Sequence, residues 1–370
     1  MKILHIGKYY PPFFGGTEKV NYDIVEGLNN LGYPADVLCF NHQKNTIDDT
    51  HNNYKIYRCK TLLKPFSTPI SFEIFLLLRK IQSQYDIIHL HLPNPIAGLA
   101  LQFSGYKGKL ILHWHCDIVK QKLVKIFYNP LQSYILKKAD KIIATSSNYL
   151  NSSKDLQPYL DKCVVIPIGI DHSSFIENIN FRNQLATQTS NKKIVFSLGR
   201  LIYYKGFEFL IKSARYLPED TIVYIGGIGH LENKLKKLIN NLKLNQKVFL
   251  LGEIPFTQLS EYYRRADVFC LPSCERTEAF GVVLLEAMMF GCPIVCCNIE
   301  GSGVSWVAKN MLNALVVPPK NEQQLSEALN ELLGDEALRV LLSQGSTSRF
   351  YEYFQAPTMV ESVINLYKSI

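Results

Sequence analysis

Apolar and polar positions along the chain form blocks that predict a repeating order of strands and helices. Short aliphatic and β-branched runs recur in both halves, as expected for strands that helices cover on both faces. The predicted strands are residues 2–7, 35–40, 86–91, 109–114, 141–146 and 163–169, then 193–200, 221–227, 247–253, 267–273, 293–298 and 314–319. The predicted helices are Glu18–Leu31, Phe207–Tyr216, Leu231–Leu242, Gln258–Arg265 and Glu322–Leu333. This alternation predicts α/β architecture with parallel sheets built from βαβ units.

Two such sets in tandem predict two doubly wound domains, and 370 residues suffice for two separate cores. The polar, Asn-rich segment 176–193 is the expected join. We therefore place the first domain at residues 1–180 and the second at 181–350. A ligand is expected in the cleft between the two sheets, at the carboxyl ends of their strands.

The composition bounds the cellular setting. No apolar run reaches the roughly eighteen residues that a membrane span needs. The start, MKILHIGKYYPPFFGG, indicates a buried strand and a loop rather than a secretory signal, so we expect a cytoplasmic protein. The nine cysteines include no CxxC pair, which argues against a zinc site and a disulfide framework.

Positive charge is concentrated in the first half, where residues 1–190 hold 21 Lys and Arg against 14 Asp and Glu. Lysines alternate with apolar residues in segment 120–138. Two interpretations stay open: a surface for peripheral contact with the inner membrane or acidic material, or a solvated helix pair broken at Pro130. Nucleic acid is a weaker candidate because no binding motif accompanies the lysines.

Glycines and polar residues mark the loops that follow two strands of the first half. Gly15 and Gly16 precede a predicted helix, where the backbone can approach a phosphate, although a tight turn explains a lone pair of glycines as well. His113, His115 and Asp117 would share one face of an extended strand. A metal site is one interpretation of that trio, but no further ligand is near in sequence. A polar end of the strand is the simpler interpretation. His113 is typical of a core histidine, so we take His115 and Asp117 as the candidate catalytic residues.

The second half offers cations and carboxylates at the corresponding places. Arg200 follows a strand and Lys205 stands just before a helix, which favours a polyanion site over two unrelated surface cations. Glu278 precedes a helix predicted over Val282–Met289, and Glu286 lies inside it. Carboxylates accept hydrogen bonds from the hydroxyls of sugars and ribose, and a carboxylate in an apolar helix is costly without such a partner.

In this order, the motifs resemble those of retaining glycosyltransferases of family 4, whose two Rossmann-like domains form the GT-B fold. The likeness covers nearly the full chain. Its most specific parts are GRLIYYKG (199–206) and EAFGVVLLEAM (278–288). The segments WHCDIVKQK and GSGVSWV are most similar to bacterial mannosyl- and rhamnosyltransferases. The resemblance implies that residues 351–370 pack back on the first domain.

The resemblance also implies roles in binding a nucleotide-sugar donor. Arg200 and Lys205 would neutralise the donor diphosphate, and Glu286 would hold the ribose hydroxyls. Gly15 and Gly16 would let the loop of the first domain close on the phosphate. The loop 300–310 would lie under the donor sugar, although it lacks the glycine pair and acidic residue of many relatives.

Further roles concern the sugar and the base of the donor. Glu278 would contact the donor sugar, next to the backbone N–H groups of Phe280 and Gly281. His115 would line the reaction centre, with Asp117 the nearest carboxylate in sequence. The base would sit near residues 253–255.

No Asp-x-Asp pair occurs in the chain, so we expect no divalent metal and no other cofactor. Fixed cations and a helix end can stabilise a leaving diphosphate instead. The expected partners are a nucleoside-diphosphate-sugar, such as GDP-mannose or a UDP-sugar, and a hydroxyl of a polysaccharide or lipid-linked saccharide. Rival classes are a sugar-nucleotide epimerase of the same fold, a non-catalytic nucleotide-sugar-binding module and a phosphorylase-like enzyme.

Overall fold

The chain forms two compact units, each built around one sheet. The computed structural model describes residues 1–13, 15–65, 68–118 and 122–370, apart from the side chains of 122–127 and 174. Unit 1 comprises Met1–Gly169 with Ala356–Ile370, and unit 2 comprises Ile170–Gln355. For comparison, the sequence placed the domain boundaries after residues 180 and 350. The final segment, from Ala356 onward, belongs to unit 1.

Unit 1 contains an eight-stranded sheet in the order β3-β4-β2-β1-β5-β6-β7-β8, parallel except for the pair β3–β4. The strands β1, β2 and β5 are buried throughout because helices cover both faces of the sheet. The strands are β1 (Ile3–Ile6), β2 (Ala35–Phe40), β3 (Ile47–His51), β4 (Tyr54–Cys59), β5 (Ile87–Leu92), β6 (Lys109–Trp114), β7 (Lys141–Ala144) and β8 (Cys163–Val165).

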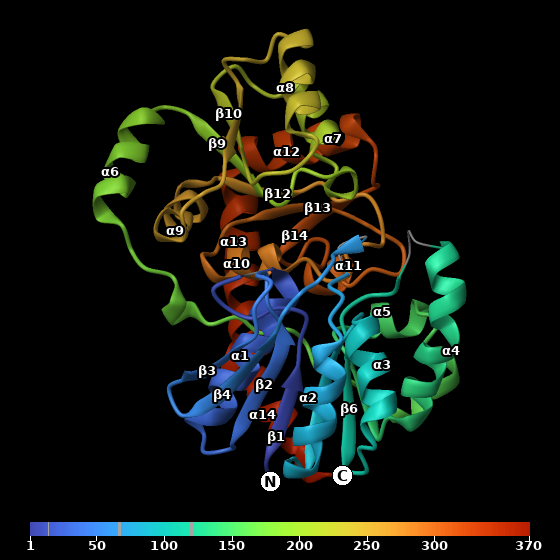
Figure 1. Cartoon of the computed structure of the whole chain (residues 1–370). Coiled ribbons are helices and arrows are strands. Elements are labelled where there is room, and N and C mark those ends of the chain that lie inside the picture. Colours follow the sequence, from blue (N-terminus) through green and yellow to red (C-terminus); the bar gives the residue numbers. More distant parts are fainter. Residues whose placement is uncertain (14, 66–67, 119–121) are drawn as a thin grey trace. The chain divides into compact units, whose positions relative to one another are not determined.

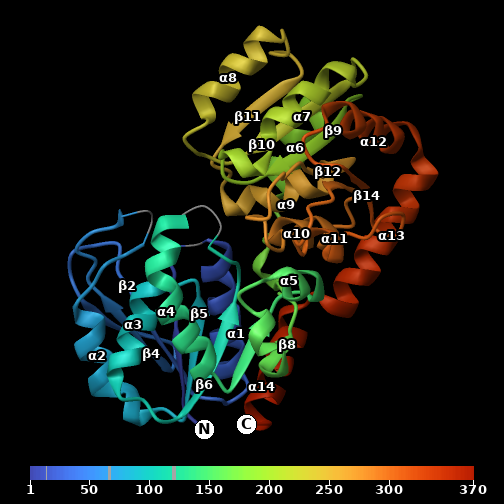
Figure 2. The ribbon, with the colours of Figure 1, turned by 90° about the vertical axis from the view of Figure 1, so that its right-hand side faces the viewer.

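Helices form a layer on each face of the unit 1 sheet. α1 and α14 lie on one side, and α2, α3 and α4 lie on the other (Figure 2). The helices are α1 (Gly16–Asn30), α2 (Glu73–Ile81), α3 (Pro95–Ser104), α4 (Lys122–Lys138), α5 (Ser147–Ser152) and α14 (Ala356–Lys368). The C-terminal helix thus supplies half of one covering layer.

The hairpin β3–β4 was not predicted from the sequence. All five residues of β3 are exposed, and Asp48 and Asp49 stand among them, so the strand lacks the apolar pattern on which the prediction rested. Asn52 makes the turn with φ of 51°, a conformation that asparagine tolerates better than most residues. The edge position explains the polarity, because charged residues on an edge strand oppose pairing with other chains.

Unit 2 contains a six-stranded parallel sheet in the order β11-β10-β9-β12-β13-β14. Its strands are β9 (Lys193–Leu198), β10 (Thr221–Gly226), β11 (Val248–Gly252), β12 (Val268–Leu271), β13 (Ile294–Cys297) and β14 (Ala314–Val317). All six strands predicted for the second half are confirmed. Strand order reverses between β9 and β12, so the carboxyl ends of these two strands are where a ligand of an open α/β sheet is expected.

Two helix layers cover this sheet as well. α7, α8 and α12 lie on one face, and α9 and α10 lie on the other (Figures 1 and 2). The helices are α6 (Ile179–Gln188), α7 (Phe207–Ser213), α8 (Glu232–Asn241), α9 (Phe256–Arg265), α10 (Val282–Met289), α11 (Val304–Val307), α12 (Glu322–Gly334) and α13 (Glu336–Tyr353). Helix α10 has the predicted bounds.

The segment expected to join the domains forms helix α6 of unit 2 instead. Arg182 donates from Nε to the buried Glu261 of α9 at 2.7 Å, and Leu185 is buried. The amphipathic signal of α6 is weak because a single apolar anchor and an ion pair hold it, which made the segment resemble a linker.

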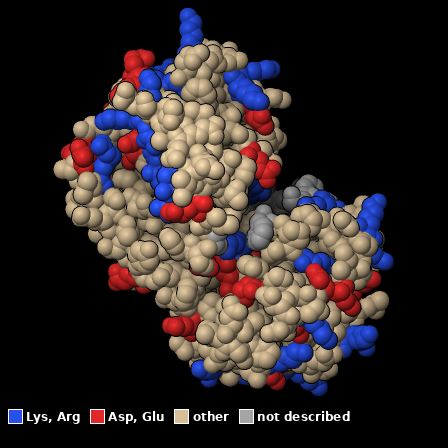
Figure 3. All heavy atoms as spheres, turned by 90° about the vertical axis from the view of Figure 1, so that its left-hand side faces the viewer, with Lys and Arg blue, Asp and Glu red and all other residues tan. Residues whose placement is uncertain are grey.

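Within the basic segment 120–138, α4 continues through Pro130 as one helix, so the interpretation of a helix pair broken at Pro130 is wrong. The helix continues although proline lacks one donor and its ring crowds the preceding turn. Lys120 lies outside the described residues. On the face drawn in Figure 3, Lys and Arg lie interspersed with Asp and Glu. In the described part of the chain, no helix is both long and apolar enough to cross a membrane.

Close packing of α1 against α14 can be tested at Gly27. A Cβ there would lie 2.5 Å from Cγ2 of Val360, a side chain too stiff to move aside. We expect Gly27→Ala to lower the free energy of unfolding of unit 1 by about 1–3 kcal/mol in urea titrations. Gly334→Ala is the control, because nothing lies within 4 Å of its Cβ. Equal stability of the two variants would contradict the packing.

Candidate active site

A buried ion pair lies beside the carboxyl ends of β9 and β12. Lys205 ends a 3₁₀ turn, Tyr203–Lys205, that follows β9, and Glu278 lies in the loop between β12 and α10. Lys205 Nζ is 2.6 Å from Glu278 Oε2, and the two side chains are only 10% and 9% exposed. The sequence identified both residues, but not that they pair with each other.

The backbone around Lys205 admits little variation. Gly206 has φ of 69°, and a Cβ there would lie 2.0 Å from the carbonyl oxygen of Pro272. Glycine is therefore required both for the left-handed conformation and for the close approach of the two loops. This approach brings the turn after β9 against the segment after β12, and so brings Lys205 to Glu278.

Two serines hold Glu278, and neither contact was predicted from the sequence. Ser273 donates from Oγ to Glu278 Oε2 at 2.7 Å. Ser302 donates to the backbone oxygen of Glu278 and accepts from the N–H of Val304 at 3.1 Å. The loop 300–310 is therefore tied to the main chain of Glu278, and Ser302, which is fully buried, makes the connection.

The buried residues Phe280 and Gly281 directly precede helix α10. Gly281 is the N-cap with φ of 81°, which explains the glycine. The first N–H groups of a helix have no partner within it, and the helix dipole makes this end positive. Both features suit an anion.

Glu286 lies farther along α10 and is half-buried. Tyr263 of α9 donates from its hydroxyl to Glu286 Oε2 at 2.6 Å. Burial first, and then the charge of Glu286, raise the pKa of Tyr263 well above its ordinary value. The tyrosine therefore stays a neutral donor that orients the carboxylate, a role that was not predicted from the sequence.

Arg200 follows β9 and is exposed. Its Nη2 lies 3.3 Å from the hydroxyl of Tyr204, and the Lys205 ammonium lies 5.7 Å from the centre of the same tyrosine ring. Arg200 and Lys205, the predicted phosphate-binding cations, thus both contact Tyr204. Lys205 also pairs with Glu278. The polyanion site stays a prediction.

Gly15 and Gly16 lie at the start of α1 in unit 1, where Gly15 is the N-cap in an extended conformation. Both are exposed, and a Cβ on Gly16 would meet nothing within 4 Å. Packing inside the unit therefore does not explain this glycine. The prediction that a phosphate approaches the backbone at Gly16 stays a prediction.

His115 and Asp117 do not share a strand face, because β6 ends at Trp114. Asp117 Oδ1 accepts from Trp114 Nε1 at 2.9 Å and from Ser153 Oγ at 2.8 Å. These bonds give Asp117 an anchoring role in the loop after β6, and its catalytic role stays a prediction. His115 instead stacks on His113, with ring centres 4.3 Å apart.

His113 and His115 belong to a larger group that the sequence analysis missed. His5 of β1 and His89 and His91 of β5 complete a buried set of five histidines. Burial lowers the pKa of His5 and of His115 to about 3. Burial and the neighbouring rings lower the pKa of the other three well below the ordinary value. The H-x-H spacing in two consecutive strands was the available signal.

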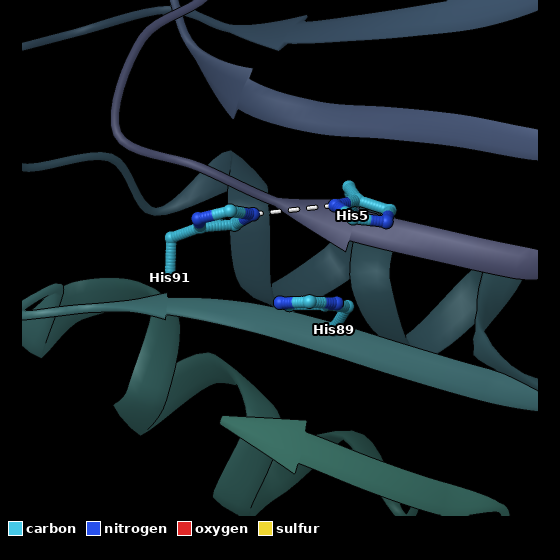
Figure 4. A group of neighbouring side chains, drawn as sticks. All are labelled: His5, His89 and His91. Carbon is cyan, nitrogen blue, oxygen red and sulfur yellow. Dashed lines mark hydrogen bonds between the residues drawn. The ribbon is translucent and has the colours of Figure 1, made fainter. Parts of the chain in front are cut away.

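Two triads in this group have ring nitrogens within 4.8 Å of one another, a spacing that a metal ion could use. They are His5, His89 and His91 (Figure 4), and His91, His113 and His115. The rings of the second triad are stacked at 10° to 19° to one another. Imidazole lone pairs lie in the ring plane, so stacked rings direct them side by side rather than toward one point. The second triad therefore fits a metal poorly.

Solved proteins share this fold. Sucrose-phosphate synthase from Thermosynechococcus elongatus has a TM-score of 0.82 at 20% identity, covering 100% of this chain and 98% of that one. Two α/β units with parallel sheets and this neighbour define the GT-B class of glycosyltransferase fold, as predicted.

Family profiles match both units: "Glycosyltransferase Family 4" over residues 14–174 and "Glycosyl transferases group 1" over residues 179–349. O-antigen chain mannosyltransferase C from Escherichia coli is 33% identical over 373 residues, covering 100% of this chain and 99% of that protein. D-rhamnosyltransferase WbpZ from Pseudomonas aeruginosa is 27% identical over 357 residues, covering 96% and 93%. The chain therefore belongs to the glycosyltransferase family that these profiles and the mannosyltransferase define, and it is a transferase enzyme.

The histidine group predicts that unit 1 loses stability in mild acid. Histidines with a pKa near 3 when folded and near 6.5 when unfolded make the unfolded chain bind more protons between these values. Stability is then fully present above about pH 6.5 and falls as the pH drops, by up to about 1.4 kcal/mol per pH unit for each histidine.

The measurement is urea unfolding at about pH 7.5 and about pH 5.5, the window in which this linkage acts. Trp306→Phe leaves Trp114 as the fluorescence reporter of unit 1, because the chain has two tryptophans. We expect a large loss at the lower pH, and the same loss with the additional change His230→Gln, since His230 is exposed in unit 2. Equal stability at the two values would contradict the linkage.

Proposed function

We propose that the protein is a retaining glycosyltransferase that moves a hexose from a nucleoside-diphosphate-sugar to a hydroxyl of a growing polysaccharide or its lipid-linked precursor. The observation that carries the proposal is the buried pair Lys205–Glu278 at the N-terminal end of α10. An isolated buried ion pair rarely adds stability, because desolvation of two charges offsets their attraction. A pair kept in this position is better explained by a ligand that needs both charges.

The cations suit the leaving group. As the bond between the anomeric carbon and the diphosphate oxygen breaks, negative charge develops on the diphosphate. Glu278 occupies one of the three N–H donors of the Lys205 ammonium. Lys205, Arg200 and the first N–H groups of α10 would stabilise the developing charge without a metal ion.

The carboxylates suit the hydroxyl groups of the donor. Glu286, oriented by Tyr263, would accept from the ribose hydroxyls, and Glu278, oriented by Ser273, would accept from a hydroxyl of the sugar. The acceptor oxygen then bonds to the anomeric carbon on the face that the diphosphate leaves. Because the acceptor oxygen attacks on that face, no nucleophile from the protein is needed, and because its proton departs with the diphosphate, no general base is needed. His115 of unit 1 would contribute to the reaction centre.

The relatives support a choice of sugar and acceptor. The names of the two curated relatives above describe a mannosyltransferase that acts on an O-antigen chain and a rhamnosyltransferase. We therefore propose GDP-mannose or a related nucleotide-sugar as donor and an envelope polysaccharide as product. Work on such an acceptor would place the protein in the cytoplasm, in peripheral contact with the membrane.

The proposal is tested by release of nucleoside diphosphate from a panel of GDP-, UDP- and dTDP-sugars, with chelator present. We expect slow release from one donor and faster release when acceptor is added. An epimerase would convert the donor to a second nucleotide-sugar without release. A binding module would show affinity and no turnover, and either result would overturn the proposal.

Two variants test the residues. Glu278→Gln and Lys205→Ala should lower kcat by about 100- to 1,000-fold, the usual cost of removing a preorganised electrostatic contact. The matched controls are Glu208→Gln and Lys234→Ala, which break an exposed ion pair of 3.4 Å in the same unit. These should leave kcat unchanged. Near-normal turnover of the first two variants would contradict the assigned roles.

A further inference from the structure

Five of the nine histidines lie together in the core of unit 1. Four of them lie on three neighbouring strands, where His5 is paired in register with His89, and His91 with His113. Residues two apart on a strand share a face, so His91 lies beside His89. His115 follows the end of β6, and its ring stacks on that of His113. None of the five is more than 5% exposed. A sheet core is usually filled with aliphatic side chains, so this set calls for a specific reason.

The imidazoles form a continuous hydrogen-bonded chain. It starts at His115, whose Nε2 lies 2.9 Å from His91 Nδ1. His91 Nε2 lies 3.2 Å from His5 Nδ1 (Figure 4), and His5 Nε2 lies 3.2 Å from the hydroxyl of Tyr367. Tyr367 of α14 thus connects the C-terminal helix to His5, and through His5 and His91 to His115.

The hydrogen-bonded chain of imidazoles continues on the other side of the Tyr367 hydroxyl. The same hydroxyl bonds to His89 Nδ1, and His89 Nε2 lies 3.3 Å from His113 Nδ1. Among the residues that the structure describes, His113 Nε2 has no partner. The chain therefore has two ends: His113 inside the core and His115 at the carboxyl end of β6.

Asn21 of α1 sets the direction of the protons. Its Oδ1 lies 3.1 Å from His5 Nδ1, and a carbonyl oxygen can only accept, so His5 carries its proton on Nδ1. A neutral imidazole has one donor and one acceptor. His5 Nδ1–H is then shared with His91 Nε2, which puts the proton of His91 on Nδ1. That proton is donated to His115 Nε2, which leaves the proton of His115 on Nδ1.

The other arm is consistent with this direction. His5 Nε2 accepts from the Tyr367 hydroxyl, whose oxygen accepts from His89 Nδ1–H. His89 Nε2 then accepts from His113 Nδ1–H. At the core end of the hydrogen-bonded chain, His113 Nε2 carries a lone pair and no proton. A buried acceptor without a hydrogen bond is less costly than a buried N–H without one. Every imidazole of the chain is the Nδ1–H tautomer.

We propose that this chain fixes His115 as the Nδ1–H tautomer, so that His115 acts in glycosyl transfer as a hydrogen-bond donor and not as a general base. Asn21, His5 and His91 are positioning residues for it. The inference rests on the proposed function, because it assigns the chemistry of His115 within it. A donor is what a departing phosphate oxygen or a sugar oxygen needs, and a base is not required where the acceptor proton leaves with the diphosphate.

The first test is nuclear magnetic resonance of the full chain labelled with ¹⁵N-histidine. Long-range ¹H–¹⁵N correlations distinguish the two neutral tautomers, and the signal lost in His115→Asn assigns His115. We expect the Nδ1–H tautomer. A dominant Nε2–H tautomer, or an equal mixture, would overturn the inference. This readout does not depend on turnover, so it stands apart from the proposed function.

The second test removes Asn21, which sets the direction of the protons. Asn21→Leu removes the carbonyl oxygen that holds the proton of His5 on Nδ1, and we expect a mixed tautomer at His115. In Ser–His–Asp enzymes, loss of the group that fixes the histidine tautomer lowers kcat by about 10⁴-fold. Here the fixing group acts through two further rings, so we expect a smaller loss, about tenfold or more, with KM for the donor unchanged.

Tyr106→Phe is the control. Its buried hydroxyl makes two bonds in unit 1, to the carbonyl oxygens of Asp86 and Lys109, and none to the histidines. The control should lose similar stability and keep its kcat and the His115 signal. Equal kinetic loss in both variants would reduce Asn21 to a structural role and overturn the positioning claim. A correct tautomer with normal turnover of His115→Asn would instead refute the role of His115 in the proposed function.

Discussion

Burial of the Lys205 ammonium against the Glu278 carboxylate is the constraint around which the site in unit 2 is built. Desolvation of two charges costs several kcal/mol per ion, and only good geometry and further hydrogen bonds offset it. Ser273 supplies one such bond at 2.7 Å. Gly206, with φ of 69°, lets the two loops meet at all. These residues make sense together only if the pair must stay buried and oriented before the ligand arrives.

The fold was largely predictable because strands covered on both faces are apolar runs that end in glycine, proline or polar residues. All six strands of unit 2 and the bounds of α10 were predicted correctly. Two of the failures, β3 and α6, share one physical cause, which is the absence of an apolar pattern. β3 is an exposed edge strand, and α6 is held by the ion pair of Arg182 with Glu261. Long-range pairing determines such elements, and local sequence does not report it.

Arg200, Lys205 and Glu278 could be identified from the sequence as charged residues next to strand ends, and Glu286 as a carboxylate in an apolar helix, whereas their roles stay predictions. The residues that support them could not be identified in this way. Ser302 donates to a backbone oxygen across a fold contact, and Tyr263 reaches Glu286 from another helix. The histidine chain was visible only in part, because its register depends on which strands are neighbours. His113 and His115 were noted, whereas Tyr367, 362 positions from His5, has no local signal.

The most direct measurement is amide hydrogen–deuterium exchange of the full chain with GDP and with UDP. The account predicts slower exchange with one nucleotide in residues 199–206 and 278–286, where the cations and the start of α10 lie. Helix α8, in the same unit, should show no change. No protection in either segment at saturating concentrations of both nucleotides, or protection confined to unit 1, would contradict the assignment of the Lys205–Glu278 site.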